Sequence, residues 1–132
     1  MSLLRRALGV GAFLLLVLSA ALVAIPRTIV EGIMGQGQVA DDVWIRLFGA
    51  GGISLALFHV LILRKLEDIW WWCWTFVIFN GMSALIALVH VTLGLPDGSA
   101  AWPWWVFGAT SALFTVLYIA GLAKAGQEKP FA

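Results

Sequence analysis

The chain has 132 residues, of which 62% are hydrophobic and 11% are charged. Soluble domains carry about 25% charged residues, so this composition excludes an ordinary soluble domain. The formal net charge of +1 provides no attraction for nucleic acid, and the single cysteine, Cys73, excludes an internal disulfide and a cysteine-based metal cage.

Four apolar runs of about 20 residues or more occupy most of the chain. A helix of that length crosses the ~30 Å hydrocarbon layer, and in lipid it satisfies its own backbone hydrogen bonds. We therefore predict an all-α integral membrane protein, a four-transmembrane-helix antiparallel bundle that forms one domain. The predicted spans cover about residues 4–25, 43–64, 69–95 and 102–123.

The first run follows two arginines, as a secretory signal peptide would. It is longer than the usual signal core of about 7–15 residues, so we interpret it as the first span. Pro26 closes this span. Residues 26–34 are predicted to form a short interfacial helix, which the glycine at Gly35 stops.

The second run begins after two aspartates and carries an arginine about one turn inside its outer end. A charged side chain at this depth needs a partner or must extend to the interface. The candidate partners of Arg46 are Asp42, Glu31 and Asp97. A functional alternative is an anion or lipid-headgroup site built from Arg46, Trp44 and His90.

The loop between the second and third spans is short, so we predict that these two helices are antiparallel neighbours. Small and polar residues of both then meet near the bilayer centre, where a hydrogen bond between Ser54 and Asn80 contributes about 0.6 kcal/mol. The predicted helix-packing residues are Gly51, Gly52, Ser54, Asn80, Gly81 and Ser83. A substrate or ion site around Asn80 is the functional alternative.

The third and fourth spans each carry small, polar and aromatic residues at three- and four-residue spacing, which places them on one helix face. Both faces are predicted to point into the bundle. Their members are Cys73, Phe76, Asn80, Ser83, Ala87 and His90 in the third span and Gly108, Ser111, Thr115 and Tyr118 in the fourth. No Asp, Glu or Lys falls at mid-depth, where ion-coupled transport usually requires one.

Eight tryptophans lie near the ends of the spans, which is typical of interfacial belts. They are Trp70, Trp71, Trp72 and Trp74 at one interface and Trp44, Trp102, Trp104 and Trp105 at the other. Consecutive residues point about 100° apart around a helix, so Trp70, Trp71 and Trp72 cannot all face lipid headgroups. At least one is expected to face a neighbouring helix, a partner subunit, or a bound pigment or lipid.

The basic residues are distributed unequally between the two sides. With four spans, one side holds Arg5, Arg6, Arg64, Lys65, Lys124 and Lys129, and the other holds Arg27 and Arg46. Basic residues concentrate on the cytoplasmic side of membrane proteins. We therefore predict that both termini are cytoplasmic, and we expect the protein in the inner membrane of a bacterium.

The two histidines are the candidate cofactor ligands. His59 and His90 lie near opposite ends of their spans, ~24 Å apart in depth, so they cannot hold one haem between them. Each could ligate its own haem or chlorophyll-type pigment. The alternative is that each forms structural hydrogen bonds and no cofactor is bound.

The sequence lacks a Gly-rich phosphate loop, a histidine pair at metal-ligand spacing and a nucleophile elbow, so we predict that it is not an enzyme. Three function classes stay open. The first is an accessory subunit of a larger membrane complex, such as a respiratory or photosynthetic one, with membrane lipids and other subunits or a second copy as partners. The second is a haem or pigment carrier, and the third is a small transporter, channel or lipid-binding protein.

Overall fold

The computed structural model describes residues 1–128, and every regular element in that range is helical. The long helices are α1 (Ser2–Ala24), α2 (Val43–Arg64), α4 (Trp74–Leu93) and α5 (Trp102–Glu128). Shorter ones are the π-helical turn η1 (Thr28–Ile33), α3 (Leu66–Ile69) and the 3-10 turn η2 (Trp70–Cys73), which lead into the neighbouring long helices. Within the described residues, four helical segments are long and apolar enough to cross a membrane, which confirms the predicted all-α class and the expected four long apolar helices.

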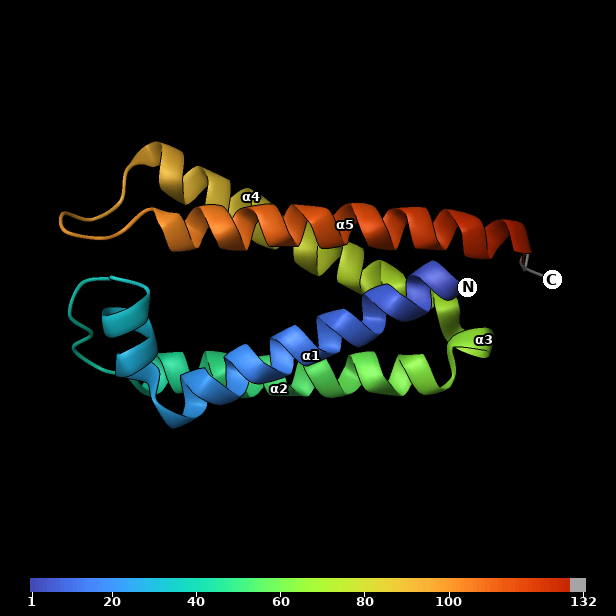
Figure 1. Cartoon of the computed structure of the whole chain (residues 1–132), viewed down its shortest axis with the longest axis horizontal. Helices are drawn as coiled ribbons and strands as arrows, with labels where there is room; N and C mark the ends of the chain where they lie inside the picture. The colour runs from blue at the N-terminus through green and yellow to red at the C-terminus, as the bar shows by residue number, and fades with distance from the viewer. Residues whose placement is uncertain (129–132) are drawn as a thin grey trace.

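The long helices associate as two pairs. The helix α1 packs along α2, α4 packs along α5, and α1 also contacts α5 (Figure 1). Both described ends of the chain lie at the same end of the molecule as α3, and η1 and the loop after α4 lie at the opposite end. We call these the terminal end and the loop end.

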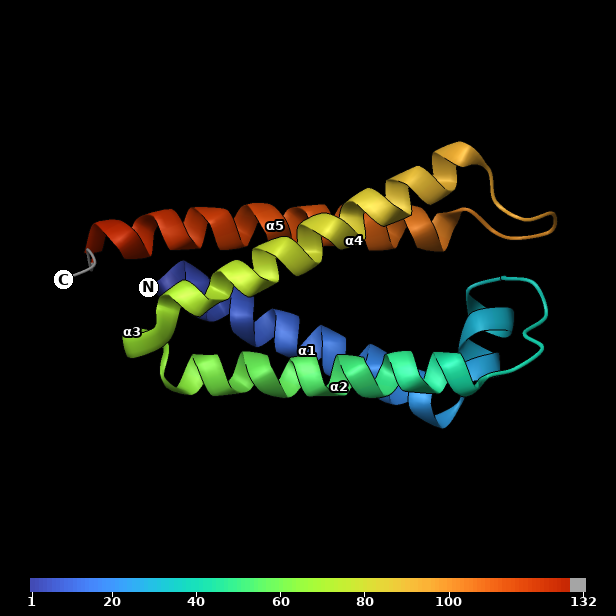
Figure 2. The same ribbon diagram turned by 180° about the vertical axis from the view of Figure 1, so that it is seen from behind.

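The prediction that the second and third spans are antiparallel neighbours holds only beside α3, and α2 and α4 do not form one of the closely packed helix pairs. The two helices approach each other beside α3, where the rings of Phe58 and Phe76 lie 5.7 Å apart, and α4 then diverges from α2 toward the loop end (Figure 2). The short α3 and η2 segments redirect the chain between them. Each helix instead uses its small residues against a different partner, α1 for α2 and α5 for α4.

The last helix is longer than predicted. The apolar run ends at Ala123, but α5 continues to Glu128. Ala125 is fully buried, and the Met1 amino group forms an ion pair of 2.7 Å with Glu128. Tertiary packing therefore extends the helix past the end of its apolar run. The predicted basic residue Lys129 lies outside the described residues.

The predicted interfacial helix over residues 26–34 corresponds to η1, which has π-helical hydrogen bonding. Gly35 follows it with a φ of +61°, a left-handed conformation that glycine adopts without steric cost. The loop is held to η1 because the Val39 amide donates to the Glu31 carboxylate at 2.7 Å. The segment is therefore an ordered cap at the loop end.

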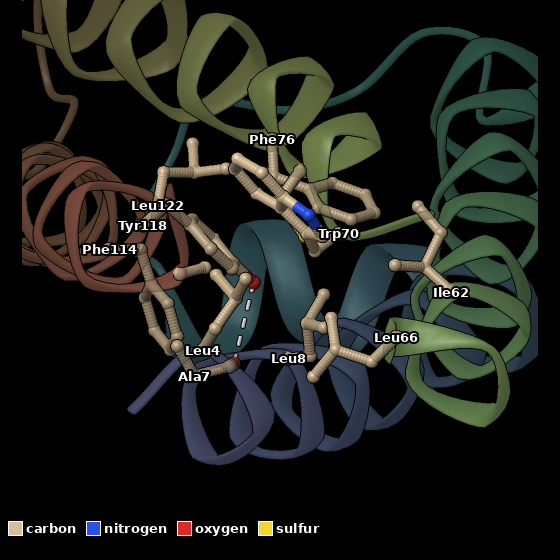
Figure 3. Close-up of a cluster of buried hydrophobic side chains, with 12 residues drawn as sticks. Leu4, Ala7, Leu8, Ile62, Leu66, Trp70, Phe76, Phe114, Tyr118 and Leu122 are labelled. Atoms are coloured by element: carbon tan, nitrogen blue, oxygen red, sulfur yellow. Dashed lines mark hydrogen bonds between the residues drawn. The ribbon is translucent and has the colours of Figure 1, made fainter. Parts of the chain in front are cut away.

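The most buried side chains gather at the terminal end, between α1, α2, η2, α4 and α5 (Figure 3). Trp70 is 7% exposed, whereas Trp71, Trp72 and Trp74 are all more than 40% exposed. This confirms that at least one tryptophan of the cluster faces neighbouring helices. Cys73, one 3-10 turn later, is fully buried in the same core.

Candidate functional site

A buried polar group joins the four long helices near the terminal end. His59 is 3% exposed on α2. Its Nδ1 lies 2.8 Å from the Leu55 carbonyl oxygen, and its Nε2 lies 3.0 Å from the Tyr118 hydroxyl on α5. A carbonyl only accepts, so Nδ1–H donates to Leu55 and Nε2 of the neutral ring accepts from Tyr118. The Tyr118 hydroxyl is also 3.4 Å from the Ala7 carbonyl oxygen of α1 (Figure 3).

Aromatic rings enclose this group on the side of α4 and α5. The His59 ring stacks on Phe76 with centroids 3.6 Å apart and planes inclined by 26°. Phe76 and Phe114 lie 5.5 Å and 6.0 Å from the Tyr118 ring. On the other side, α1 approaches Tyr118 closely at Gly11. A Cβ at this position would lie only 2.8 Å from the Tyr118 hydroxyl, so α1 leaves no room there for another group. Side chains or backbone of α1, α4 and α5 therefore pack around the His59 and Tyr118 side chains.

The arrangement suits a structural role better than ligation. Both ring nitrogens of His59 have partners within the chain, so a haem or pigment metal at Nε2 would have to displace Tyr118. The hydrogen bond from Tyr118 to His59 joins α2 and α5, with the Ala7 carbonyl of α1 3.4 Å from the same hydroxyl, in a position where an unpaired polar group would cost about 1–3 kcal/mol. The group therefore fixes how the two helix pairs meet, since α1 and α2 form one pair and α5 belongs to the other.

The second candidate ligand, His90, lies apart from His59 near the loop end of α4. Its ring is half-buried and contacts Trp104 of α5 edge-on, with centroids 4.5 Å apart and planes inclined by 68°. The two histidines occupy different helix pairs and different ends of the molecule. They therefore form separate environments, and ligation by His90 stays a prediction.

Arg46 closes the end of another helix. Its guanidinium donates to the Val23 carbonyl in the last turn of α1 and lies 3.3 Å from the Asp42 carboxylate. The last carbonyls of a helix have no partner within that helix, so a cation here satisfies one of them and favours the helix dipole. Arg27 lies 4.0 Å from the same carboxylate. The pairing of Arg46 with Asp42 was one of the sequence interpretations.

The predicted anion site is not assembled by contacts among its three members. Arg46 contacts α1 and Asp42, and His90 contacts Trp104. Trp44 is 74% exposed and lines a cavity described below. The reason is that α2 and α4 diverge toward the loop end, where these side chains lie. Among the described residues, the contacts of Arg46 go to α1 and Asp42 and the ring contact of His90 goes to Trp104, so an anion or lipid-headgroup site built from the trio stays a prediction.

Two of the three predicted packing glycines, Gly52 and Gly81, face helices other than the predicted ones. A Cβ at Gly52 would collide with the Ser19 hydroxyl of α1, and one at Gly49 would lie 2.8 Å from the Ser19 carbonyl oxygen. A Cβ at Gly81 would lie 3.8 Å from the Thr115 methyl group of α5. Gly51 has no neighbour within 4 Å.

The predicted hydrogen bond between Ser54 and Asn80 does not form. The Ser54 hydroxyl donates to the Ala50 carbonyl, and the Asn80 amide donates to the Phe76 carbonyl, each within its own helix. Ser83, also predicted to pack in this contact, is half-buried. Since α4 diverges from α2, Ser54 and Asn80 each bond within their own helix.

A cavity of about 370 Å³ lies between the two helix pairs at the loop end. Its walls are apolar and come from α1, η1, α2 and α5, including Leu18, Leu22, Val30, Ile45, Phe48 and Phe107. Sequence reasoning missed this cavity because its walls come from helices whose relative placement no periodicity specifies. It also missed the role of Gln36, which lies among the lining residues.

Comparisons with protein-family models, curated proteins and solved structures give no match to this chain. The class that the fold defines is an all-helical chain whose four long apolar segments are compatible with a small multi-pass membrane protein. Beyond that class, function has to be argued from the side chains and surfaces described above.

Proposed function

We propose that this chain is an accessory subunit of a larger membrane complex, embedded in a bacterial inner membrane with both termini in the cytoplasm. The orientation is supported by charge. Arg5, Arg6, Arg64, Lys65 and Lys124 belong to the helix ends at the terminal end, whereas Arg27 and Arg46 lie at the loop end. Basic residues favour the cytoplasmic side, so the terminal end faces the cytoplasm.

The observation that carries the accessory role is an uncovered face of α2. Within residues 1–128, no atom outside its own helix backbone lies within 4 Å of the place that a Cβ at Gly51 would take, and Ser54 is exposed at mid-span. Phe58 lies on the same face, about two turns from Gly51 toward α3. Its ring contacts those of Phe76 and Trp72, so the chain after α3 covers only the terminal end of this face. Membrane helices bury small and polar residues against other helices, because lipid offers them neither close packing nor hydrogen bonds.

The neighbouring face of α4 adds polar groups to this opening. Asn80 and Ser83 are half-buried, and the one side-chain hydrogen bond of Asn80 goes to the Phe76 carbonyl. An Asn side chain has two N–H donors and a carbonyl acceptor, so part of its capacity remains for a partner. A transmembrane helix of another subunit would bring its backbone close to Gly51 and supply polar partners to Ser54 and Asn80.

The closed His59 and Tyr118 group supports the same proposal. The most buried polar side chains between the helix pairs are occupied by contacts within the chain. They join helices and leave no open nucleophile or acid at that position. Because these buried polar side chains stabilise the fold, we infer that the protein functions by binding a partner at its surface.

Co-purification from the native membrane in mild detergent tests this function. We expect a defined partner to accompany the wild-type chain and to be lost from Gly51→Leu, because the added side chain blocks close approach of a helix. Gly9→Leu is the matched control, since Gly9 on α1 also has no neighbour within 4 Å. Equal recovery of the partner with both variants, or a wild-type chain that purifies alone as a monomer, would contradict the proposal.

A further inference from the structure

The cavity at the loop end has apolar walls and a polar roof. Its volume of about 370 Å³ falls within the range of small-molecule sites, about 300–1,000 Å³. Gln36 is the lining residue with a polar side chain other than the indoles of Trp44 and Trp104. The remaining walls are aliphatic, aromatic, proline and methionine side chains from both helix pairs.

Gln36 turns its polar atoms into a bridge between the two loops. Its Nε2 donates to the Met34 carbonyl at 2.9 Å and to the Ala100 carbonyl at 3.0 Å. Its Oε1 accepts from the Trp104 indole at 3.1 Å, and the Ala100 amide donates to the Gly35 carbonyl at 2.9 Å. These bonds hold the two loops together beside the cavity, and they engage the polar atoms of Gln36 while the other walls are mainly apolar.

Water is a poor occupant of such a space, because apolar cavities offer it no hydrogen bonds and stay dry. The cavity wall is shared with the outer surface, since Trp44 and Phe48 line it and are 74% and 61% exposed. Tryptophans concentrate at the level of lipid headgroups, so Trp44 and Trp104 place the cavity just inside the hydrocarbon layer. The molecules that meet this wall in a membrane are therefore lipid chains.

We propose that the cavity binds one acyl chain of a phospholipid from the leaflet at the loop end, next to the Gln36 bridge. This inference rests on the membrane-spanning part of the proposed function and is independent of any partner subunit. The chain fills the space between α1 and α2 on one side and α5 on the other, and so supports the two helix pairs where they are not in direct contact. The headgroup stays outside, at the level of Trp44.

The test uses the full-length protein, alone, in phosphatidylcholine vesicles that contain a phosphatidylcholine with a photoreactive diazirine in one acyl chain. After irradiation, labelled residues are mapped by mass spectrometry. We expect labelling of Phe107 and Ile45 that saturates and is displaced by excess unlabelled lipid. The exposed Leu61 and Leu113, which are 59% and 58% exposed and line neither this cavity nor the groove between α1 and α2, should be labelled in proportion to bulk lipid without saturation.

A cavity-filling variant provides the second readout. Ile45→Trp should reduce labelling of Phe107 several-fold, and Leu61→Trp, on the lipid-facing side of the same helix, should leave it unchanged. If Ile45→Trp does not fold, Val30→Phe fills the cavity from η1 instead.

Two outcomes would overturn the proposal. Labelling of Leu61 and Leu113 with none at Phe107 and Ile45 would show a membrane-embedded chain whose cavity takes no acyl chain. Labelling of Phe107 that never saturates would show ordinary contact with bulk lipid. Absence of label from Leu61 and Leu113 as well would instead contradict the membrane-spanning part of the proposed function.

Discussion

At the scale of single residues, the contact between His59 and Tyr118 does most to join the helix pairs. The hydroxyl has one proton and two acceptors within reach, Nε2 of His59 at 3.0 Å and the Ala7 carbonyl at 3.4 Å. In the neutral state the shorter contact takes the proton, because Nδ1 already carries the ring hydrogen. Loss of the hydroxyl therefore leaves Nε2 without a donor in a closed apolar environment.

We predict that Tyr118→Phe lowers the free energy of unfolding by about 1–2 kcal/mol, because a buried acceptor loses its partner while the ring packing is kept. Denaturant titration in detergent, followed by circular dichroism, measures the change. Thr92→Val is the control, since its hydroxyl is exposed and bonds only within α4. Equal stability of both variants would show that the hydrogen bond to His59 contributes nothing.

The histidines also allow a direct test of the cofactor alternative. Because both nitrogens of His59 are engaged, we expect the isolated chain to be colourless in the visible range, with no spectral change in His59→Ala or His90→Ala. Absorbance spectra of protein purified from the native membrane provide the measurement. A visible band that stays with this chain and disappears in either variant would show that the chain carries a haem or pigment on that histidine.

At the scale of elements, α2 has two faces rich in small residues that have different uses. Gly49 and Gly52 receive Ser19 and Val23 of α1, whereas Gly51 and Ser54 are uncovered. Adjacent residues point about 100° apart on a helix, so Gly51 and Gly52 lie on different faces. Gly52 therefore serves the packing of α2 against α1, and the adjacent Gly51 lies on the face that we propose for a partner.

We predict that Gly52→Leu destabilises the isolated protein by about 1–3 kcal/mol, because the new side chain meets Ser19 in a packed contact. Gly51→Leu should leave the unfolding free energy of the isolated chain within about 0.5 kcal/mol of the wild type. Thermal denaturation in detergent distinguishes the two. Wild-type stability of Gly52→Leu would show that α1 and α2 do not pack closely at Ser19.

At the scale of the whole molecule, Met1 and the end of α5 at Glu128 lie at one end because four long helices alternate in direction (Figure 1). We predict that reporter fusions at Ala132 and between Gly37 and Gln38 report opposite sides of the membrane, with the C-terminus cytoplasmic. Paired fusions active in the cytoplasm or in the periplasm give the measurement. A periplasmic C-terminus would contradict the proposed orientation.

The sequence by itself determined the number of long helices and most of their limits. Apolar runs bounded by charges, glycine and proline specify where a helix can enter and leave lipid, and this information is local. Local reasoning also indicated that Trp70, Trp71 and Trp72 could not share one environment, and the burial of Trp70 agrees. Local reasoning ended the last helix too early, because the turn that extends α5 to Glu128 depends on contacts with the N-terminus.

Only the tertiary structure decided which helices pair. Gly52 and Gly81 each fit a close neighbour, but the sequence does not state which helix supplies it, and the short loop suggested the wrong one. For the same reason His59 and Tyr118 were both noticed and never joined, and the bridge at Gln36 was missed. Helical periodicity gives the direction of a side chain around its own axis, whereas a site requires the positions of several axes, which are set by the packing of distant segments.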